Sequence, residues 1–230
     1  MGIAQIISVD EAVKLIPSNS TIMFGGFVGC GAALKTIDAI SKNPDIQNIT
    51  GIFNDSSKLN GPDGEAEYAW AKLIHTGQLT GYIGSHLGTN PEASALWAEG
   101  KLKVELVPQG SLAEMIRAGG TGLGGVITPT GVGTLVEESP YVRGKVNYDG
   151  VDYLIMKPLH ADIALLCGSK VDPAGNVWFR GTTSNFQTVM ALAADTVIVE
   201  AEEMVDIGDI HQEDVRIPSI LVDYIVKREG

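Results

Sequence analysis

The sequence predicts an open α/β fold: a mostly parallel sheet with helices on both faces and a small antiparallel insert. Short, nearly uncharged runs rich in β-branched residues alternate with segments of helical periodicity along most of the chain. Strands that alternate with helices are typical of a parallel sheet covered on both faces. The 230 residues are enough for one large core, so we expect residues 1–230 to form a single domain.

The first third of the chain begins with a helix. In "SVDEAVKLIP", Ser8 can cap that helix, Glu11 completes a capping box and Pro17 ends it. "STIMF" then indicates a short buried strand, which leads directly into a glycine-rich stretch. "AALKTIDAISK" has helical periodicity and stops at Asn43-Pro44.

The same alternation continues. "NITGIF", "LTGYIG" and "KVELV" are predicted strands, separated by helical patterns at Glu65 to Ile74 and Pro91 to Glu99, the second capped by Asn90. "SLAEMIRAGG" predicts a helix with a second capping box, Ser111 to Glu114. "IALLCG" and "TVIVE" are predicted strands on either side of the helical "FQTVMALAA".

The segment at about 136–159 differs from this pattern. "YVRGKVNYDGVDYLIM" alternates between apolar and polar residues and carries turn signals at Arg143-Gly144 and Asp149-Gly150. We expect antiparallel strands here, attached to the main sheet.

Composition excludes several classes of function. A net charge of −12 and a pI near 4.7 argue against nucleic-acid binding. No stretch reaches the roughly 18 uncharged apolar residues of a membrane span, and we expect a cytoplasmic protein. Cys30 and Cys167 lie far apart, which suits a reducing compartment and favours buried, inert thiols. The four histidines lack the short spacings of metal ligands, so no metal site is predicted.

The glycine-rich stretch fails two known motifs. The dinucleotide fingerprint needs a third glycine where Leu34 stands, and the phosphate loop needs lysine where Ala32 follows Gly31. Two interpretations stay open: a close approach of ligand to backbone, with N–H groups facing an anion, or a tight turn packed in the core. A second glycine cluster, at 119–133, either shapes a site or forms a long structural connection.

Five motifs together carry a family resemblance. "GGFVGCG", "VELVPQGSLAEMIRAGG", "TPTGVGTLVEE" and "ALAADTVIVEAEE" look like the alpha subunit of the family I coenzyme A transferases, and "SHLGTNPE" resembles the bacterial acetate–acetoacetate type. The resemblance implies a ping-pong reaction through a glutamyl-CoA thioester, with acyl-CoA as a substrate and no permanently bound cofactor. The family's nucleophile lies in a Ser-Glu-Asn-Gly or Glu-x-Gly motif. This chain has neither, so we expect a beta subunit as partner, in an assembly of two alpha and two beta chains.

The resemblance also implies site residues. Gln109 matches an active-site glutamine that stabilises an oxyanion, although a turn residue bonded to nearby backbone is the alternative. The coenzyme A signature falls on Gly25, Gly26, Phe27, Val28, Gly29, Cys30 and Gly31. Thr89 stands where the succinyl enzyme has glutamate, which suggests monocarboxylates such as acetate, butyrate or acetoacetate. Asn90, Thr128, Thr130 and Gly131 are further substrate-site candidates.

A second class of function stays open beside the transferase: a non-transferase on a related scaffold, either sugar-phosphate isomerase-like or a ligand-binding regulator. A neighbouring reading frame with Ser-Glu-Asn-Gly or Glu-x-Gly would discriminate, because a transferase half requires one and a regulator does not.

Overall fold

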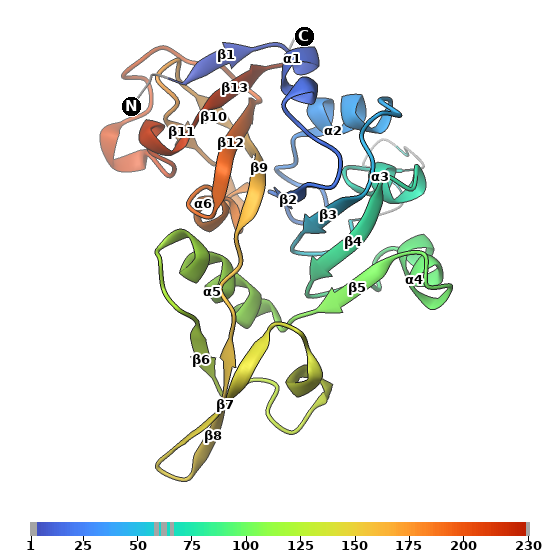
Figure 1. The fold of residues 1–230 in the computed structure, drawn as a ribbon. Coiled ribbons are helices and arrows are strands. Elements are labelled where there is room, and N and C mark those ends of the chain that lie inside the picture. The colour runs from blue at the N-terminus through green and yellow to red at the C-terminus, as the bar shows by residue number, and fades with distance from the viewer. Residues whose placement is uncertain (1–3, 58–59, 61–63, 65–66, 229–230) are drawn as a thin grey trace.

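The computed structural model describes residues 4–57, 60, 64 and 67–228 and is built around an eight-stranded sheet (Figure 1). In the order in which they lie side by side, its strands are β1 (Gln5–Ile7), β13 (Tyr224–Lys227), β12 (Ala194–Ala201), β9 (Ala161–Gly168), β2 (Thr21–Phe24), β3 (Ile49–Ile52), β4 (Leu79–Gly84) and β5 (Lys103–Leu106). All neighbouring pairs are parallel. The predicted fold class is confirmed.

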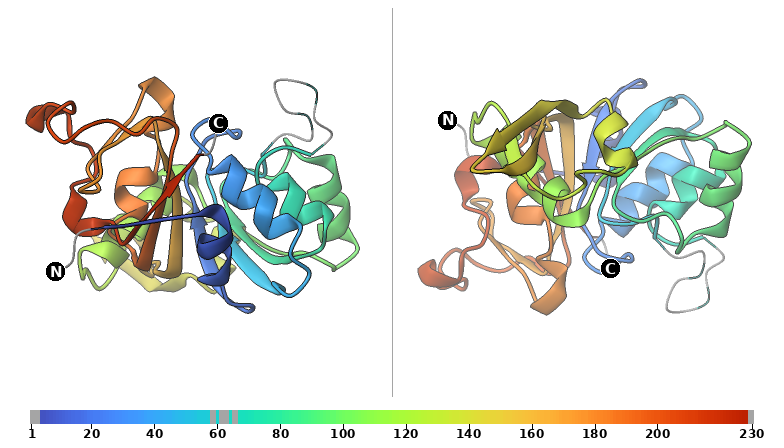
Figure 2. Two further views of the ribbon diagram at one scale, coloured as in Figure 1. Left: turned by 90° about the horizontal axis from the view of Figure 1, so that it is seen from above. Right: turned by 90° about the horizontal axis from the view of Figure 1, so that it is seen from below.

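Helices cover both faces of this sheet (Figure 2). They are α1 (Val9–Lys14), α2 (Leu34–Ser41), α3 (Ala71–His75), α4 (Pro91–Ala98), α5 (Gln109–Gly120) and α6 (Gln187–Met190). Helices α1 to α4 pack into one hydrophobic core, and α5 and α6 pack into the other. Successive strand residues point to opposite faces, so Ile163 and Leu165 of β9 enter the first core while Ala164 and Leu166 enter the second.

The expected helix ends are largely confirmed. Ser8 and Glu11 form the predicted capping box of α1, with the Ser8 N–H donating to the Glu11 carboxylate at 2.8 Å. Helix α2 ends before Asn43-Pro44. The Asn90 side chain caps α4 by accepting from the Ala93 N–H at 3.1 Å.

The helix predicted at Glu65 to Ile74 is too long. Residues 65 and 66 lie outside the described residues, 67–70 form a bend and turn, and α3 starts only at Ala71. Ala69 has a φ of 51°, and the Trp70 indole N–H donates to the Asp55 carbonyl at 2.9 Å. The segment is rich in good helix formers, so tertiary contacts such as this bond override its local helix propensity.

Two other helix predictions need correction. Helix α5 begins at Gln109, so Ser111 lies inside it and does not cap it, and Glu114 pairs with Arg117 at 2.6 Å. Because Pro108 is already fixed in φ, it can precede the helix without a side-chain cap. Helix α6 covers only four residues of "FQTVMALAA", since turns follow Met190.

The predicted antiparallel insert exists, but it is a separate sheet. Strands β6 (Val126–Thr128), β8 (Val151–Met156) and β7 (Val142–Tyr148) pair in that order and project from the body in Figure 1. Attachment to the main sheet was therefore wrong, and pairing begins at 126, ahead of the expected 136. Asp149-Gly150 forms the hairpin turn with φ of 52° and 82°. Arg143-Gly144 lies within β7, at a shift in register.

The remaining elements are short. A two-stranded antiparallel hairpin joins β10 (Lys170–Val171) to β11 (Val177–Trp178), and 3-10 turns occur at Leu135–Glu138, Gly181–Thr183, Gln212–Asp214 and Ser219–Leu221. Within the described part of the chain, no helix has the length and apolar character needed to cross a membrane.

Candidate functional site

The order of the strands locates one point where the chain changes direction across the sheet. From β2 the chain runs outward through β3, β4 and β5, and from β9 it runs the other way through β12 and β13. Strands β2 and β9 are neighbours, so the sheet has its topological switch point between them. In open α/β sheets, ligands bind outside the carboxyl ends of the strands at this point. The candidate site is therefore at the ends of β2 and β9.

The glycine loop Gly25–Gly31 follows β2 at this point. Phe27 and Cys30 exchange two backbone hydrogen bonds of 3.0 and 2.9 Å, which close the loop on itself. Gly31 has a φ of 75°, and a Cβ there would lie 2.9 Å from the Thr183 carbonyl oxygen. Glycine is therefore required both by the backbone conformation and by a close approach from the far side of the switch point.

Most N–H groups of this loop already have acceptors within the chain. The Gly25 N–H donates to the Leu165 carbonyl at 3.0 Å, and the Val28 N–H donates to the Asp55 carboxylate at 2.8 Å. Gly26 donates to the Asn185 side-chain oxygen at 3.3 Å. Because Phe27 and Cys30 bond each other, five of the seven N–H groups are used internally. If the loop binds an anion through its backbone, as expected from the sequence, the N–H groups of Gly29 and Gly31 are the two without an acceptor among the described residues.

Asp55 is the internal anion of this loop. Its side chain is 3% exposed, and its two oxygens accept from the N–H groups of Val28 and Ser57 at 2.8 and 2.6 Å. Burial raises the pKa of this carboxyl, while the two backbone hydrogen bonds and the charge of His86 act against that rise. Asp55 thus ties the glycine loop to the end of β3.

Gln109 reaches the same place from α5. Its Nε2 donates to the side-chain oxygen of Asn54 at 2.7 Å, and the Asn54 Nδ2 donates to the Gly26 carbonyl at 2.8 Å. The structure therefore brings Gln109 and the glycine loop together through one residue. The alternative that Gln109 serves only as a turn residue bonded to nearby backbone is not what is observed, because its partner is 55 positions away in sequence.

Thr89 and Asn90 lie after β4 and differ in availability. The Thr89 hydroxyl is half-buried and lies 3.0 Å from the Ser56 hydroxyl. Asn90 is fully buried, with its oxygen capping α4 and its nitrogen 3.3 Å from the Ser56 carbonyl. Asn90 therefore holds the loop that presents Thr89, and its own side chain is 0% exposed and so out of reach of a ligand.

The other three candidates belong to the insert. Thr128 and Thr130 line a groove of about 610 Å³ between α5 and β6, opposite Gly110 and Ser111, which directly follow Gln109. The Thr130 N–H donates to the Thr128 hydroxyl at 3.2 Å. Gly131 has a φ of 93°, and a Cβ there would lie 2.8 Å from Val136. Its place is explained by the turn that it makes.

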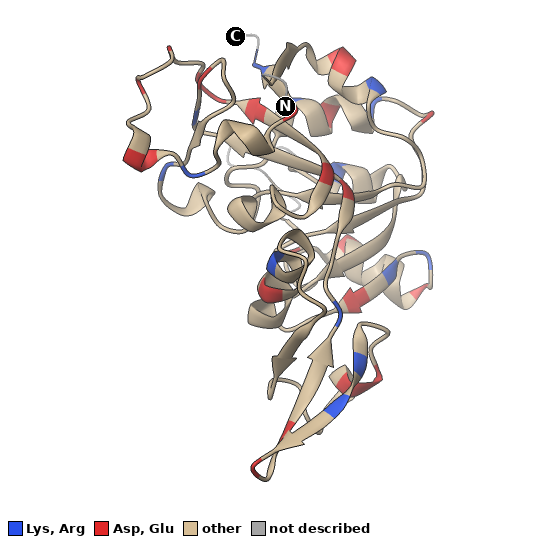
Figure 3. Cartoon of the chain, turned by 60° about the vertical axis from the view of Figure 1, so that its left-hand side comes forward, with Lys and Arg blue, Asp and Glu red and all other residues tan. Residues whose placement is uncertain are grey.

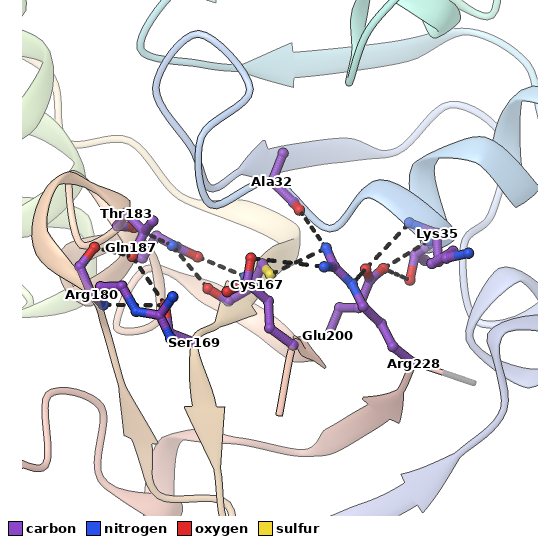
Figure 4. Close-up of polar contacts among 11 residues, drawn as sticks. Ala32, Lys35, Cys167, Ser169, Arg180, Thr183, Gln187, Glu200 and Arg228 are labelled. Carbon is purple, nitrogen blue, oxygen red and sulfur yellow. Dashed lines mark hydrogen bonds and ion pairs between the residues drawn. The ribbon is translucent and has the colours of Figure 1, made fainter. Parts of the chain in front are cut away.

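A buried charge supports the far end of the glycine loop. Glu200, at the end of β12, is 0% exposed and accepts from the backbone N–H and hydroxyl of Thr36, both at 2.8 Å, in the first turn of α2. Arg228 donates to Glu200 at 2.6 Å and to the Ala32 carbonyl at 3.4 Å (Figure 4). This carboxylate satisfies N–H groups at a helix start and complements its dipole.

The sequence predictions missed Asn54, Asp55, Asn185 and Glu200. One signal could have found the first two, since the polar run "NDSS" directly follows a predicted strand of a parallel sheet, where ligand sites form. The prediction that both thiols are buried holds for Cys167 and is wrong for Cys30, which is exposed on the closed loop. No group of three or more potential metal ligands occurs among the described residues.

Fold and site together define an open α/β protein whose polar groups gather at the switch point of a parallel sheet. The chain belongs to the coenzyme A transferase family, whose model matches residues 6–228. It is 44% identical to the acetoacetyl-CoA:acetate/butyrate CoA transferase alpha subunit of Clostridium acetobutylicum, over 97% of this chain and 98% of that protein. It is 36% identical to the acetate CoA-transferase subunit alpha of Escherichia coli K12, over 96% of both chains.

Longer proteins also match. A mouse mitochondrial succinyl-CoA:3-ketoacid coenzyme A transferase is 38% identical over 94% of this chain, which covers 43% of that protein. Among solved structures, an acyl-CoA transferase from Escherichia coli O157:H7 in a thioester complex with CoA has a TM-score of 0.82 at 24% identity, over 98% of this chain and 47% of that one. Glutaconate coenzyme A-transferase from Acidaminococcus fermentans has a TM-score of 0.81 at 19% identity, over 97% of this chain and 75% of that one. These two structures support the fold.

Proposed function

We propose that this chain is the alpha subunit of a short-chain acyl-CoA transferase, which moves coenzyme A between an acyl-CoA and a free short-chain carboxylate. The observation that carries the proposal is the pair of hydrogen bonds that joins Gln109 to Asn54 and Asn54 to Gly26. They lie at the switch point of the sheet in a member of the coenzyme A transferase family. The most similar relatives named above are alpha subunits that act on acetate, butyrate or acetoacetyl-CoA. We assign the same substrate class, acetyl-, butyryl- or acetoacetyl-CoA, to this chain.

The reaction needs a nucleophilic carboxylate from a partner. A glutamate of the beta subunit attacks the thioester carbonyl, the C–S bond breaks, and a mixed anhydride and a CoA thiolate form. The thiolate then attacks the glutamyl carbonyl of the anhydride and releases the first carboxylate, leaving a glutamyl-CoA thioester. The acceptor carboxylate reverses these steps. Electrons and charges balance without an oxidant, and one difficult exchange becomes two easier ones.

This chain contributes binding and electrostatic stabilisation. Each attack on a carbonyl places negative charge on oxygen, and the Gln109 amide can donate to that oxygen. A donor of this kind is worth a factor of about 100 to 1,000 in kcat. Thr89, Thr128 and Thr130 supply hydroxyls around the acyl group. Coenzyme A has few N–H donors to meet on the glycine loop, so we place most of its anionic contacts on the beta subunit.

We propose a complex of two alpha and two beta chains in the cytoplasm, where the two free thiols would stay reduced. The test is exchange of coenzyme A between acetyl-CoA and acetoacetate or butyrate, measured for this chain alone and mixed with its beta chain. We expect activity only in the mixture. Activity of the lone chain would overturn the half-enzyme assignment, and a complex that stays inactive over a broad panel of acyl groups would overturn the transferase.

A further inference from the structure

The side-chain amides of Gln109, Asn54 and Asn185 form a row of hydrogen bonds across the switch point, here called the amide relay. Backbone groups fix the orientation of the two asparagines. Asn54 is 2% exposed, and its Nδ2 lies 2.8 Å from the Gly26 carbonyl oxygen, which can only accept. The Asn54 nitrogen must therefore face Gly26. Its oxygen is left to face Gln109, whose nitrogen lies 2.7 Å away.

A second amide supports the same direction. The Asn185 side-chain oxygen accepts from the backbone N–H groups of Phe186 at 2.6 Å and Gly26 at 3.3 Å, and backbone N–H groups can only donate. That oxygen also lies 3.3 Å from the Asn54 nitrogen, in agreement with Asn54 donating on this side. A reversed Asn54 amide would set its oxygen against two acceptors and its nitrogen against the Gln109 nitrogen.

The orientation of the Asn54 amide decides whether it bonds the nitrogen or the oxygen of the Gln109 amide. A side-chain amide has two N–H donors on nitrogen and only acceptor sites on oxygen. When one N–H is given to Asn54, the second remains on the same nitrogen for a ligand. Without Asn54, the exposed Gln109 amide could rotate and present its carbonyl oxygen, which would repel a developing oxyanion.

We propose that Asn54 is a positioning residue of the transferase reaction: it orients the Gln109 amide so that an N–H group faces the reacting thioester. Asn54 acts through Gln109 and does not itself contact the reacting atoms. The proposal rests on the proposed function of Gln109. The backbone N–H and carbonyl of Gly26 each engage one asparagine of the relay. Glycine is needed there because its φ is 132° and a Cβ would lie 3.0 Å from the Trp70 ring.

A double-mutant cycle tests the proposal in the reconstituted alpha–beta complex, with kcat and KM measured for Gln109→Ala, Asn54→Ala and both together. We expect Asn54→Ala to lower kcat about tenfold or more with a smaller change in KM, because misorientation of one group is costly in the transition state. In the Gln109→Ala background the same change should have almost no further effect on kcat. An equal fold-loss of kcat in both backgrounds would mean a general structural role and overturn the proposal.

Two further variants guard against misfolding. Ser85→Ala removes a 2.7 Å hydrogen bond from the Ser85 hydroxyl to the Asn54 backbone carbonyl and leaves the amide relay intact, so its kcat should stay within about twofold of wild type. If Asn54→Ala does not fold, Asn54→Ser takes its place in the cycle. A loss in Ser85→Ala equal to that in the Asn54 variant would also count against the relay.

NMR of the Gln109 side-chain amide separates this proposal from the proposed function. In the wild-type chain, one of its two N–H protons should be shifted downfield and exchange slowly, and Asn54→Ala should return both to the values of a free glutamine. Free-glutamine signals in the wild type would overturn the relay whatever the activity. Bonded signals in a complex without transferase activity would retain the relay and remove the reaction.

Discussion

At the scale of single residues, the site depends on groups whose partners are far apart in the sequence. Gln109, Asn54 and Gly26 are joined by two hydrogen bonds that span 55 and 28 positions. Motifs indicated Gln109 and Gly26, each inside a recognisable string. Asn54 has only the polar run "NDSS" around it, which marks the end of a strand but does not single out Asn54 or its partners. A single sequence can therefore suggest both ends of this link, while the role of the residue between them is evident only when the strands are set side by side.

Thr89 provides a test of substrate choice at the same scale. Its hydroxyl lies 3.0 Å from Ser56, at the mouth of the loop held by Asn90. In Thr89→Glu the added carboxylate should repel succinate, which has two carboxylates, more strongly than acetate. This order would reverse only if a cation compensated the added charge. In this chain we expect kcat/KM for acetate to fall about tenfold or more.

The measurement is kcat/KM for acetate and succinate with Thr89→Glu and with Thr89→Ser as a control that keeps the hydroxyl. Thr89→Ser should stay close to wild type for both acids. An unchanged ratio of the two acids in Thr89→Glu, together with unchanged values for acetate, would remove Thr89 as a determinant of specificity.

Gly31 tests the packing of the glycine loop. Gly31 and Gly77 have nearly equal φ values, 75° and 72°, but only Gly31 has a backbone oxygen 2.9 Å from where a Cβ would be, and nothing lies within 4 Å at Gly77. Both alanine variants carry the strain of a left-handed backbone, about 1 kcal/mol. Gly31→Ala adds a collision, so its free energy of unfolding should fall by about 1–3 kcal/mol more than that of Gly77→Ala.

Urea unfolding of the two variants measures this difference. Because Gly77 lies outside the site, it reports the cost of backbone strain alone. Equal losses for both variants would show that the switch point can move away from Thr183 without cost, and that the loop is less tightly packed than the distances indicate.

At the scale of elements, the glycine loop is held between two strand ends and the start of α2. Glu200 accepts from two N–H groups of that helix, those of Lys35 and Thr36, and pairs with Arg228 at 2.6 Å. A carboxylate that is 0% exposed is tolerated here because every oxygen is satisfied by hydrogen bonds or charge. The start of α2, and with it the end of the loop, is thereby fixed relative to β12.

Glu200→Gln should destabilise the chain by about 3 kcal/mol, since it leaves the partly buried Arg228 guanidinium without a full counter-charge and removes one acceptor from α2. Glu202→Gln is the matched control. Glu202 lies 3.7 Å from the same guanidinium but is 34% exposed, so its loss should cost under about 1 kcal/mol. Urea unfolding of both variants decides the point, and comparable losses would contradict a special role for the buried carboxylate.

At the scale of the whole molecule, sequence patterns predicted the sheet and most helix ends, because these depend on local periodicity and caps. Strands β1 and β13 were missed, since each is short and pairs at the edge of the sheet with a distant segment. The insert was predicted as antiparallel from its alternation, yet its separation from the main sheet was not, because which strand pairs with which is a tertiary property. The same reason hid Glu200, 164 positions from Thr36.

The charge of the whole chain leads to the last prediction. The 28 acidic and 16 basic residues give a net charge of −12, and Figure 3 shows the acidic residues spread over many elements. Their mutual repulsion opposes the compact state, whereas exposed ion pairs such as Lys42–Asp38, with the lysine 73% exposed, contribute about 0–1 kcal/mol each. Salt screens both the repulsion and the ion pairs. Because the ion pairs contribute little, the weaker repulsion should dominate and the fold should become more stable. Raising NaCl from about 0.02 to 0.3 M at pH 8 should raise Tm by about 2–4 °C. The rise should shrink at about pH 5.5, closer to the pI of 4.7, where less excess charge remains to be screened. A fall in Tm with salt at pH 8 would mean that the ion pairs outweigh the repulsion.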